Sequence, residues 1–245
     1  MKVNVLFSNH YLDELYFTGK TAIVIDVLRA TTVIATALAN GAREVIPVST
    51  VDFAMKVSGD AFRSQTLLCG ERNTKKVEGF NLGNSPLEYL PDVVSGKSII
   101  LYTTNGSKSF VKAKFCENLF SASFSNLPAI VDHLVSLNQD FEIICAGTNG
   151  AFNFEDTICA GNIIIELESL TKDLVLSDSA QASVILFKNY GKSIKKMLSK
   201  TEHGKQLIEN GFGDDIEECS KIGTTDVIPY YNSGVLKRLE PEAEN

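Results

Sequence analysis

Short apolar runs rich in β-branched residues alternate along this chain with segments of helical periodicity. The runs are VNVLF (3–7), TAIVIDVL (21–28), EVIPVS (44–49), TLLCG (66–70), SIILYT (98–103), LFSAS (119–123), FEIICAG (141–147) and DVIPYY (226–231). Such alternation is typical of βαβ units, in which a helix connects two parallel strands. We therefore predict an α/β fold with a largely parallel sheet and strands at these eight positions.

Residues 154–222 depart from this alternation because they are almost continuously helical in pattern. The breaks that we expect within this block lie at Lys172-Asp173, Gly191-Lys192, Gly204 and Gly211-Phe212-Gly213. A helical block followed by a last strand predicts a second lobe or a cap that packs on the sheet. No linker rich in Pro or Gly separates the block from the rest, so we expect a single domain over 1–245. Two subdomains, about 1–150 and 151–245, stay open within it.

Two helix boundaries have readable local signals. A helix over 30–39 is predicted to end at Asn40-Gly41, a typical C-terminal cap. The segment 85–88 reads Ser-Pro-Leu-Glu, which predicts a capping box with Ser85 as N-cap and Glu88 at the third helical position.

Acidic residues outnumber basic ones, with 30 Asp and Glu against 23 Lys and Arg, so the formal net charge is −7. Nucleic acid and membrane surfaces are bound by basic faces, and we expect neither partner. No apolar run approaches the roughly 20 residues of a membrane-spanning helix, and the first ten residues lack the apolar core of a secretory signal. The expectation is a soluble, cytoplasmic protein with a small-molecule partner.

Cysteine and histidine usage excludes several metal and redox motifs. The five cysteines include no CxxC pair, and the three histidines lack metal-ligand spacing, which argues against a zinc ribbon or a thioredoxin-like motif. We interpret Cys69, Cys145 and Cys159 as small buried hydrophobic residues and His133 as a helix-face residue.

Polar residues that follow the predicted strands are the first candidates for a site, because ligands of open parallel sheets bind at the carboxyl ends of the strands. Asp26 lies within an apolar run, and Arg29 and Thr31 follow it closely. A buried carboxylate without a partner costs several kcal/mol, so Asp26 should pair with Arg29 or hold a metal ion. The alternative to a site is a structural Asp–Arg pair in which Thr31 caps the next helix.

Glu71 and Arg72 follow the next candidate strand and open a long polar connection. This connection runs to Asn84 and Ser85 at the start of a helical segment. Long connections in compact domains are usually functional, and a helix N-terminus suits an anion. A solvated loop without function is the alternative.

The triplet Thr-Asn-Gly occurs twice after a predicted strand, at 104–106 and at 148–150. Small hydroxyl, amide and glycine residues allow the backbone to approach a phosphate or sulfonate. The repeat is either a duplicated strand–turn–helix unit or a chance recurrence of good turn residues. After the second triplet, Glu155 and Asp156 open a long helix, where they either complement its dipole or bind a divalent cation.

Several phosphate-handling motifs are excluded by inspection. Three Gly-Lys-Ser/Thr triplets occur, but Glu14, Pro91 and Leu186 stand where a P-loop needs its first Gly. The chain has no GxGxxG after its first strands and no GxSxG nucleophile elbow. Leu28 replaces the second Asp of the DxD motif of aspartate-nucleophile phosphatases.

Taken together, four segments resemble the 2-phosphosulfolactate phosphatase family, also called the ComB family. They are IDVLRATTVIATALANGAREVIPV (25–48), CGERNTKKVEGFNLGNSP (69–86), LYTTNGSKSF (101–110) and ICAGTNGAFNFEDTICAGNII (144–164), and a weaker similarity covers 203–231. The resemblance implies a three-layer α/β/α fold with a largely parallel or mixed sheet. It also implies a magnesium-dependent phosphatase that converts (2R)-phosphosulfolactate to (R)-sulfolactate and phosphate, a step of coenzyme M biosynthesis.

That function assigns expected roles to the candidate residues. The expected metal ligands are Asp26, Glu71, Glu155 and Asp156, and the expected catalytic residues are Asp26, Arg29, Glu71 and Asp156. The expected substrate-binding residues are Arg29, Thr31, Arg72, Asn84, Ser85, Thr104, Asn105, Gly106, Thr148, Asn149 and Gly150. Lys75 or Lys76 would add positive charge near a multiply anionic substrate. Whether Asp26 acts as a covalent nucleophile or as a general base stays open.

Two other functions remain open at this stage, and so does the assembly state. A metal-dependent phosphatase of another phosphorylated hydroxy acid would share the same scaffold. A non-catalytic anion-binding protein is disfavoured, because acids beside an anion do not help to bind it. A homodimer is plausible.

Overall fold

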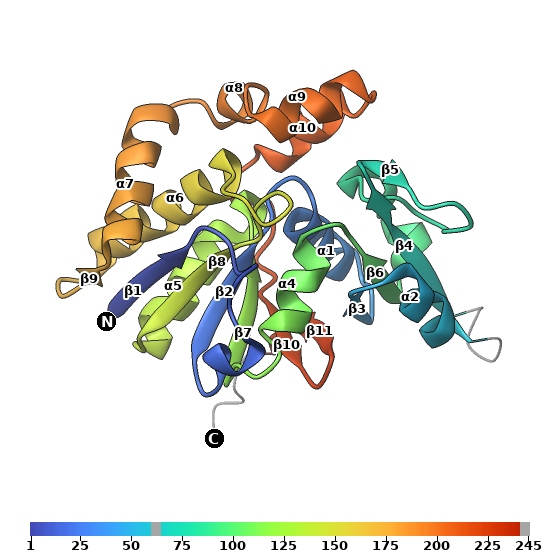
Figure 1. Ribbon diagram of the computed structural model, residues 1–245, viewed down its shortest axis with the longest axis horizontal. Helices are drawn as coiled ribbons and strands as arrows, with labels where there is room; N and C mark the ends of the chain where they lie inside the picture. Colours follow the sequence, from blue (N-terminus) through green and yellow to red (C-terminus); the bar gives the residue numbers. More distant parts are fainter. Residues whose placement is uncertain (60–64, 241–245) are drawn as a thin grey trace.

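A mixed sheet forms the centre of the computed structural model, which describes residues 1–59 and 65–240 (Figure 1). The strand order is β5-β4-β6-β3-β11-β10-β7-β2-β8-β1-β9. The strands are β1 (Lys2–Leu6), β2 (Thr21–Ile25), β3 (Glu44–Val48), β4 (Thr66–Arg72), β5 (Lys75–Lys76), β6 (Ser98–Tyr102), β7 (Asn118–Ala122), β8 (Phe141–Cys145), β9 (Val175–Leu176), β10 (Pro229–Asn232) and β11 (Val235–Arg238).

All eight predicted strands are confirmed, although the last one begins at Pro229 rather than at Asp226. Three short strands were not predicted. β5 and β9 have two residues each, too few for a periodic pattern, and β11 has four residues, of which the last two are polar and exposed.

Two groups of parallel strands are joined by an antiparallel hairpin. One group is β4-β6-β3 and the other is β7-β2-β8-β1. The hairpin β10–β11 lies between them and pairs antiparallel with β7 and with β3. The expected sheet, largely parallel or mixed, is therefore a mixed sheet.

Helices cover both faces of the sheet, which confirms the expected three layers. They are α1 (Ala30–Ala39), α2 (Val51–Ser58), α3 (Pro91–Val94), α4 (Gly106–Lys112), α5 (Leu127–Leu137), α6 (Phe154–Leu170), α7 (Asp178–Tyr190), α8 (Ile194–Leu198), α9 (Glu202–Glu209) and α10 (Gly213–Cys219). Ile23 and Ile25 of β2 share a buried cluster with residues of α5, α6 and α7. Ala22 and Val24 alternate with them and share a second cluster with residues of α1 and α4. This alternation follows from the two-residue period of a strand.

The helical block contains α6 to α10, and Figure 1 shows α8, α9 and α10 above the ends of the central strands. Its expected breaks are correct except at Gly204, which lies inside α9. A Cβ at Gly204 would come within 1.9 Å of the carbonyl oxygen of Leu198. This glycine therefore permits close backbone packing and does not end a helix. The subdomain division stays a prediction.

The helix over 30–39 is confirmed, and Gly41 has a φ of +88°, but the capping box at 85–88 is wrong. Residues 86–88 form one 3₁₀ turn, and Ser85 makes no side-chain cap bond. The Ser85 hydroxyl instead donates to Asp215 Oδ1 at 2.5 Å, and Glu88 accepts from the backbone N–H of Gly83 at 2.8 Å. The Ser85 hydroxyl thus satisfies the buried carboxylate of Asp215 and does not cap the 3₁₀ turn.

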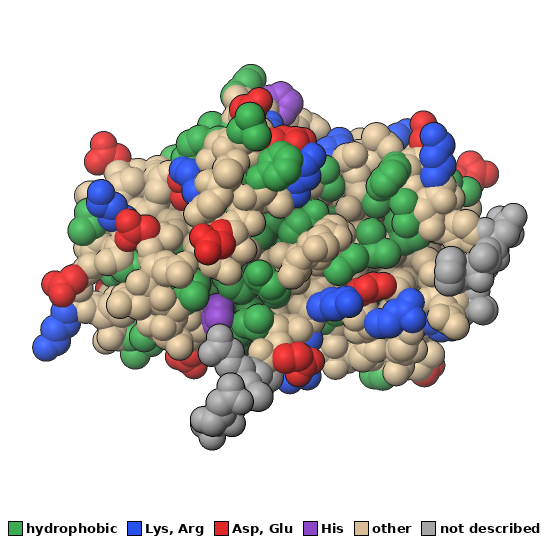
Figure 2. Space-filling model, turned by 90° about the horizontal axis from the view of Figure 1, so that it is seen from below, with side chains coloured by type: hydrophobic (Ala, Val, Ile, Leu, Met, Phe, Trp, Pro, Cys, Tyr) green, Lys and Arg blue, Asp and Glu red, His purple; other side chains and the backbone are tan. Residues whose placement is uncertain are grey.

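The surface seen in Figure 2 carries Lys, Arg, Asp and Glu side chains interspersed with hydrophobic ones. Over 1–59 and 65–240, no helix combines the length and the apolar character that crossing a bilayer requires. Cys69, Cys145 and Cys159 are buried, as expected. His133 lies on α5, with its ring edge-on to Phe120.

Candidate active site

The segments that follow β2, β4, β6 and β8 meet at one place in the molecule. The backbone N–H of Val27, after β2, donates to Asp156 Oδ1 at 2.9 Å. The N–H of Thr104, after β6, donates to Glu71 Oε1 at 2.8 Å. The N–H of Asn149, after β8, donates to Asn105 Oδ1 at 3.1 Å. These bonds bring the four predicted polar segments together.

Asp26 lies at the centre of this region, directly after the fully buried strand β2. Among the residues that the structure describes, its side chain accepts one hydrogen bond, a long one from the N–H of Ala30 at 3.3 Å. The Thr31 hydroxyl accepts from the N–H of Asp26 and donates to its carbonyl oxygen, so Thr31 fixes the backbone of Asp26. The residue is 8% exposed, and within the described ranges no ion pair joins it to Arg29.

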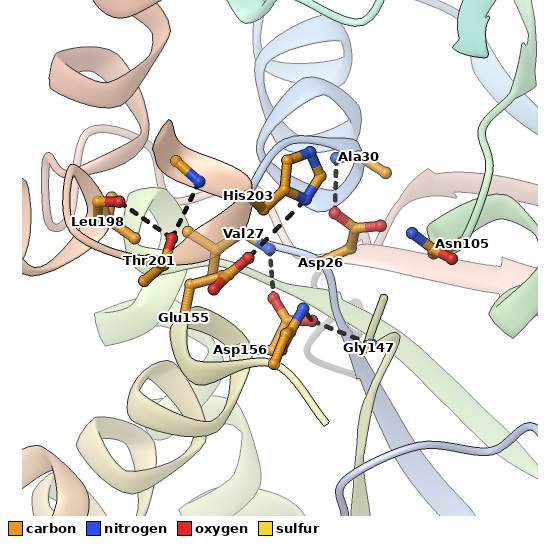
Figure 3. A network of polar contacts seen from close by, with 12 residues as sticks. Asp26, Val27, Ala30, Asn105, Gly147, Glu155, Asp156, Leu198, Thr201 and His203 are labelled. Atoms are coloured by element: carbon orange, nitrogen blue, oxygen red, sulfur yellow. Dashed lines mark hydrogen bonds and ion pairs between the residues drawn. The ribbon is translucent and has the colours of Figure 1, made fainter. Parts of the chain in front are cut away.

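Glu155 and Asp156 begin α6, and both are buried against Asp26 (Figure 3). Asp156 Oδ2 accepts from the backbone N–H of Gly147 at 3.3 Å and from Asn153 Nδ2 at 2.7 Å. Together with its bond to Val27, these contacts tie α6 to the ends of β2 and β8. Glu155 Oε1, in contrast, is buried without a hydrogen-bond partner.

Burial and mutual repulsion disfavour the charged forms of these three carboxyl groups. Desolvation raises the pKa of Asp26 to about 7, and the charges of Glu71 and Glu155 act in the same direction. Desolvation also raises the pKa of Asp156, with further contributions from Asp26 and Glu155. The pKa of Glu155 is raised by burial as well. Closely spaced buried carboxyl groups with raised pKa values are typical of functional sites.

His203 on α9 lies over the carboxylates, a placement that sequence reasoning missed (Figure 3). Its Nδ1 is 3.8 Å from Glu155 Oε1. Burial and the charge of Arg29 lower the pKa of His203, so the imidazole is neutral near pH 7. Local sequence gave no signal for this contact, because His203 stands in a helix that only tertiary packing brings to the site.

Arg29 is buried and held by segments distant in sequence. Its Nη1 donates to Asp215 Oδ2 of α10 at 2.6 Å, and its Nη2 donates to the carbonyl oxygen of Thr74 at 2.8 Å. Its guanidinium carbon lies 4.4 Å from the centroid of the Phe212 ring. The ion-pair partner of Arg29 is therefore Asp215, and the structural Asp26–Arg29 pair, one of the two alternatives for Asp26, is wrong. The contact of Arg29 with substrate stays a prediction.

The polar connection after β4 divides into a buried part and an exposed part. Glu71 Oε2 accepts from the N–H of Thr74 at 2.8 Å. Asn84 and Ser85 are buried, and the Ser85 hydroxyl donates to Asp215, the ion-pair partner of Arg29. Arg72 is exposed and lines a separate pocket of about 620 Å³ together with Lys75 and Lys76. The structure thus brings Glu71, Asn84 and Ser85 to the site region and places Arg72 at its periphery.

The two Thr-Asn-Gly triplets lie close together but differ in conformation. Gly106 begins α4, where a Cβ would come within 2.5 Å of Asp26 Oδ2. Asn149 and Gly150 have φ values of +52° and +82°, and Thr148 forms a bridge with Ala151. The identical triplets thus serve a helix start and a left-handed turn, which gives no support to a duplication.

The carboxylates of the site differ in how well they fit a magnesium ion. In the described part of the chain, no group of three His, Cys, Asp or Glu side chains is placed to hold a metal ion unaided. Asp156 and Glu71 accept backbone N–H groups at both oxygens, whereas Glu155 Oε1 is unpartnered. Mg²⁺ commonly binds one or two carboxylates, several waters and substrate phosphate. Asp26 and Glu155 fit that mode of binding better than the expected set of four.

Buried polar atoms without partners surround the same region. They are Asn9 Nδ2, Thr74 Oγ1, Asn84 Oδ1, Thr104 Oγ1, Asn153 Oδ1 and Glu155 Oε1. Buried polar groups are normally hydrogen-bonded, so such a concentration indicates a place where a polar ligand or water completes the bonding.

Comparison with known proteins identifies the family of the chain. The family model described as 2-phosphosulpholactate phosphatase matches residues 9–234. A protein of Thermotoga maritima is 44% identical over 217 residues, 89% of this chain and 91% of its own length. One from Caldanaerobacter subterraneus is 42% identical over 218 residues, 89% of this chain and 90% of its own. One from Clostridium acetobutylicum is 38% identical over 236 residues, 96% of this chain and 100% of its own. All three are named "Probable 2-phosphosulfolactate phosphatase". The chain belongs to the 2-phosphosulfolactate phosphatase family.

Proposed function

We propose that this protein is a magnesium-dependent phosphatase that hydrolyses (2R)-phosphosulfolactate to (R)-sulfolactate and phosphate, a step toward coenzyme M. The observation that carries the proposal is the group of buried carboxylates at the end of β2 and the start of α6, in a chain of this family. Buried carboxylates would repel an anion, so they do not help a protein that only binds anions. A cation that assists hydrolysis of a phosphate monoester, in contrast, needs carboxylate ligands.

Asp26 and Glu155 would hold the ion, and the bound cation would neutralise phosphoryl charge and lower the pKa of the attacking water. Asp156 fixes the geometry of this centre, because its bonds to Val27 and Gly147 position α6 against two strands. Glu71 likewise holds the Thr104 backbone in place. Gly106 allows the start of α4 to lie directly against Asp26, because a Cβ at this position would come within 2.5 Å of Asp26 Oδ2.

Two roles remain for Asp26 at the phosphorus atom. As a base it would take the proton of the attacking water, and as a nucleophile it would form an aspartyl phosphate. Hydrolysis of a substrate with a chiral isotopically labelled phosphoryl group separates them. One direct displacement by water inverts the configuration at phosphorus, whereas two successive displacements retain it.

The proposal is tested by phosphate release from 2-phosphosulfolactate after dialysis, with added Mg²⁺ and with excess EDTA. We expect turnover with Mg²⁺ and none with EDTA. A panel with other phosphorylated hydroxy acids tests the substrate. Full activity in EDTA would contradict the metal dependence, and a clear preference for another hydroxy acid would contradict the assigned substrate.

A further inference from the structure

The buried guanidinium of Arg29 has more hydrogen-bond donors than the protein uses. Its side chain is 1% exposed, and a guanidinium carries five N–H donors. Nη1 donates to Asp215 Oδ2 at 2.6 Å, and Nη2 donates to the carbonyl oxygen of Thr74 at 2.8 Å. Among the described residues, the other donors of this side chain have no acceptor. A buried donor without a bond costs free energy, so Arg29 is arranged to receive a further acceptor from outside the protein.

The guanidinium lies close enough to the carboxylates for its charge to act on them. Arg29 is the N-cap of α1, the helix whose first N–H, on Ala30, donates to Asp26 Oδ1. Burial has the largest effect on the pKa of Asp26 and on that of His203, and the charge of Arg29 acts to lower both. An acceptor that reaches the free donors of Arg29 is therefore inside the site region.

Asp215 fixes one end of this guanidinium. Its Oδ2 accepts from Arg29, and its Oδ1 accepts from the Ser85 hydroxyl at 2.5 Å. The Asp215 side chain is 2% exposed, so water does not compete for these bonds. Because both oxygens are engaged, the carboxylate cannot rotate without breaking a bond, and Nη1 is held at one place.

Two further contacts confine the plane of the guanidinium. The Thr74 carbonyl holds Nη2, and the backbone of Thr74 is itself held, because its N–H donates to Glu71 Oε2 at 2.8 Å. The Phe212 ring lies against the guanidinium, with 4.4 Å between the ring centroid and the guanidinium carbon. Phe212 and Asp215 both belong to the start of α10. This helix therefore acts on the site through Arg29.

We propose that Asp215 is a positioning residue that holds the Arg29 guanidinium so that its free donors face the phosphoryl group at Asp26. This inference rests on the proposed function. A guanidinium binds a phosphoryl group well only when its planar fork is aligned with the oxygens, and side chains packed behind a functional group supply that alignment. Ser85 would then orient Asp215, and its hydroxyl would not bind the substrate.

The first test is a double-mutant cycle on kcat/KM for phosphosulfolactate. Asp215→Asn keeps the shape of the side chain but removes its charge, and we expect kcat/KM to fall by roughly tenfold or more. In the Arg29→Met background, the same substitution should change kcat/KM by less than about threefold, because the residue through which Asp215 acts is gone. Losses that multiply across the cycle would overturn the inference. So would an unchanged kcat/KM of folded Asp215→Asn with a lower melting temperature, the result expected of a purely structural pair.

Calorimetric titration with inorganic phosphate in the presence of Mg²⁺ makes the test independent of turnover. We expect Asp215→Asn to weaken phosphate binding by roughly tenfold. Asp214→Asn, at the neighbouring exposed position of α10, is the matched control and should bind phosphate like the wild type.

The two measurements separate this inference from the proposed function. Weaker phosphate binding in Asp215→Asn, in a protein that does not hydrolyse phosphosulfolactate, would support the positioning role and contradict only the proposed function. Hydrolysis with unchanged kcat/KM and unchanged phosphate binding in Asp215→Asn would overturn the positioning role and leave the function intact. If Asp215→Asn does not fold, Ser85→Ala decides the outcome, because it frees Asp215 Oδ1 but retains the ion pair. A kcat/KM of Ser85→Ala within about twofold of the wild type would then overturn the inference.

Discussion

The guanidinium of Arg29 and the carboxylate of Asp215 form a buried ion pair at 2.6 Å, although 186 residues separate them in the sequence. The pair fastens α10 to the segment that follows β2, directly beside Asp26. Ser85 donates to the same carboxylate. Three distant parts of the chain are thus joined by one acidic side chain.

Arg29→Met should destabilise the protein by roughly 3–5 kcal/mol, because it leaves the Asp215 charge buried without its partner. The double variant Arg29→Met/Asp215→Leu should recover part of that loss, since neither charge remains. Urea unfolding of the wild type, both single variants and the double variant measures the coupling. If the loss in unfolding free energy of the double variant equals the sum of the two single losses, Arg29 and Asp215 do not stabilise the fold as a pair.

Arg29→Lys separates structure from catalysis at this residue. Lysine retains the charge but lacks the planar fork whose two terminal nitrogens donate separately to Asp215 and to the Thr74 carbonyl. We expect a lower melting temperature, because the bonds to Asp215 and Thr74 change, and a lower kcat/KM, because Arg29 is predicted to contact the substrate. A kcat/KM within a few-fold of the wild type would show that Arg29 only holds Asp215 and Thr74 in place.

Metal-free Asp26→Asn should melt several degrees above the wild type at pH 8, and the two should converge near pH 4. Burial raises the pKa of Asp26 from 3.8 to about 7. Between these values the folded state keeps a proton that the unfolded state releases, so this group destabilises the fold increasingly as pH rises through that range. Thermal melts at several pH values in EDTA measure the difference. A constant difference across pH would argue against the raised pKa.

Asp156→Asn should behave differently, although both residues are buried acids. Its carboxylate accepts from the N–H groups of Val27 and Gly147, and an amide can replace only one of its two oxygens. We expect a loss of about 1–3 kcal/mol from the unsatisfied donor. Glu166→Gln, on the exposed part of the same helix, is the control and should be neutral. An unchanged stability in Asp156→Asn would mean that these bonds contribute little.

Gly106→Ala should impair catalysis without removing any functional group. The added methyl would lie 2.5 Å from Asp26 Oδ2, so the carboxylate must move. Displacement of a catalytic group by about 1 Å can cost roughly a hundredfold in rate. Gly213→Ala also places alanine at the start of a helix, but in open space, and should retain kcat/KM. Equal kcat/KM in the two variants would contradict a role of Asp26 in the reaction.

The sequence predicted those parts of the site that depend on local order. Asp26 follows β2, Glu71 lies at the carboxyl end of β4 and Glu155 lies in the first turn of α6. Parallel βαβ units bring such positions together. The contacts of Asp215 and His203 were missed because they depend on how α9 and α10 pack on the sheet. The prediction of a capping box at Ser85 was wrong for a related reason, because the Ser85 hydroxyl donates to the buried Asp215 instead.

The central claim is that the carboxylate of Asp26 is required for hydrolysis of phosphosulfolactate. The most direct measurement is kcat/KM for phosphate release with saturating Mg²⁺ in the wild type, in Asp26→Asn and in Asp132→Asn, whose side chain is exposed on α5. We predict a loss of roughly a hundredfold or more for Asp26→Asn in a folded protein and wild-type activity for Asp132→Asn. Activity of folded Asp26→Asn within a few-fold of the wild type would contradict the account.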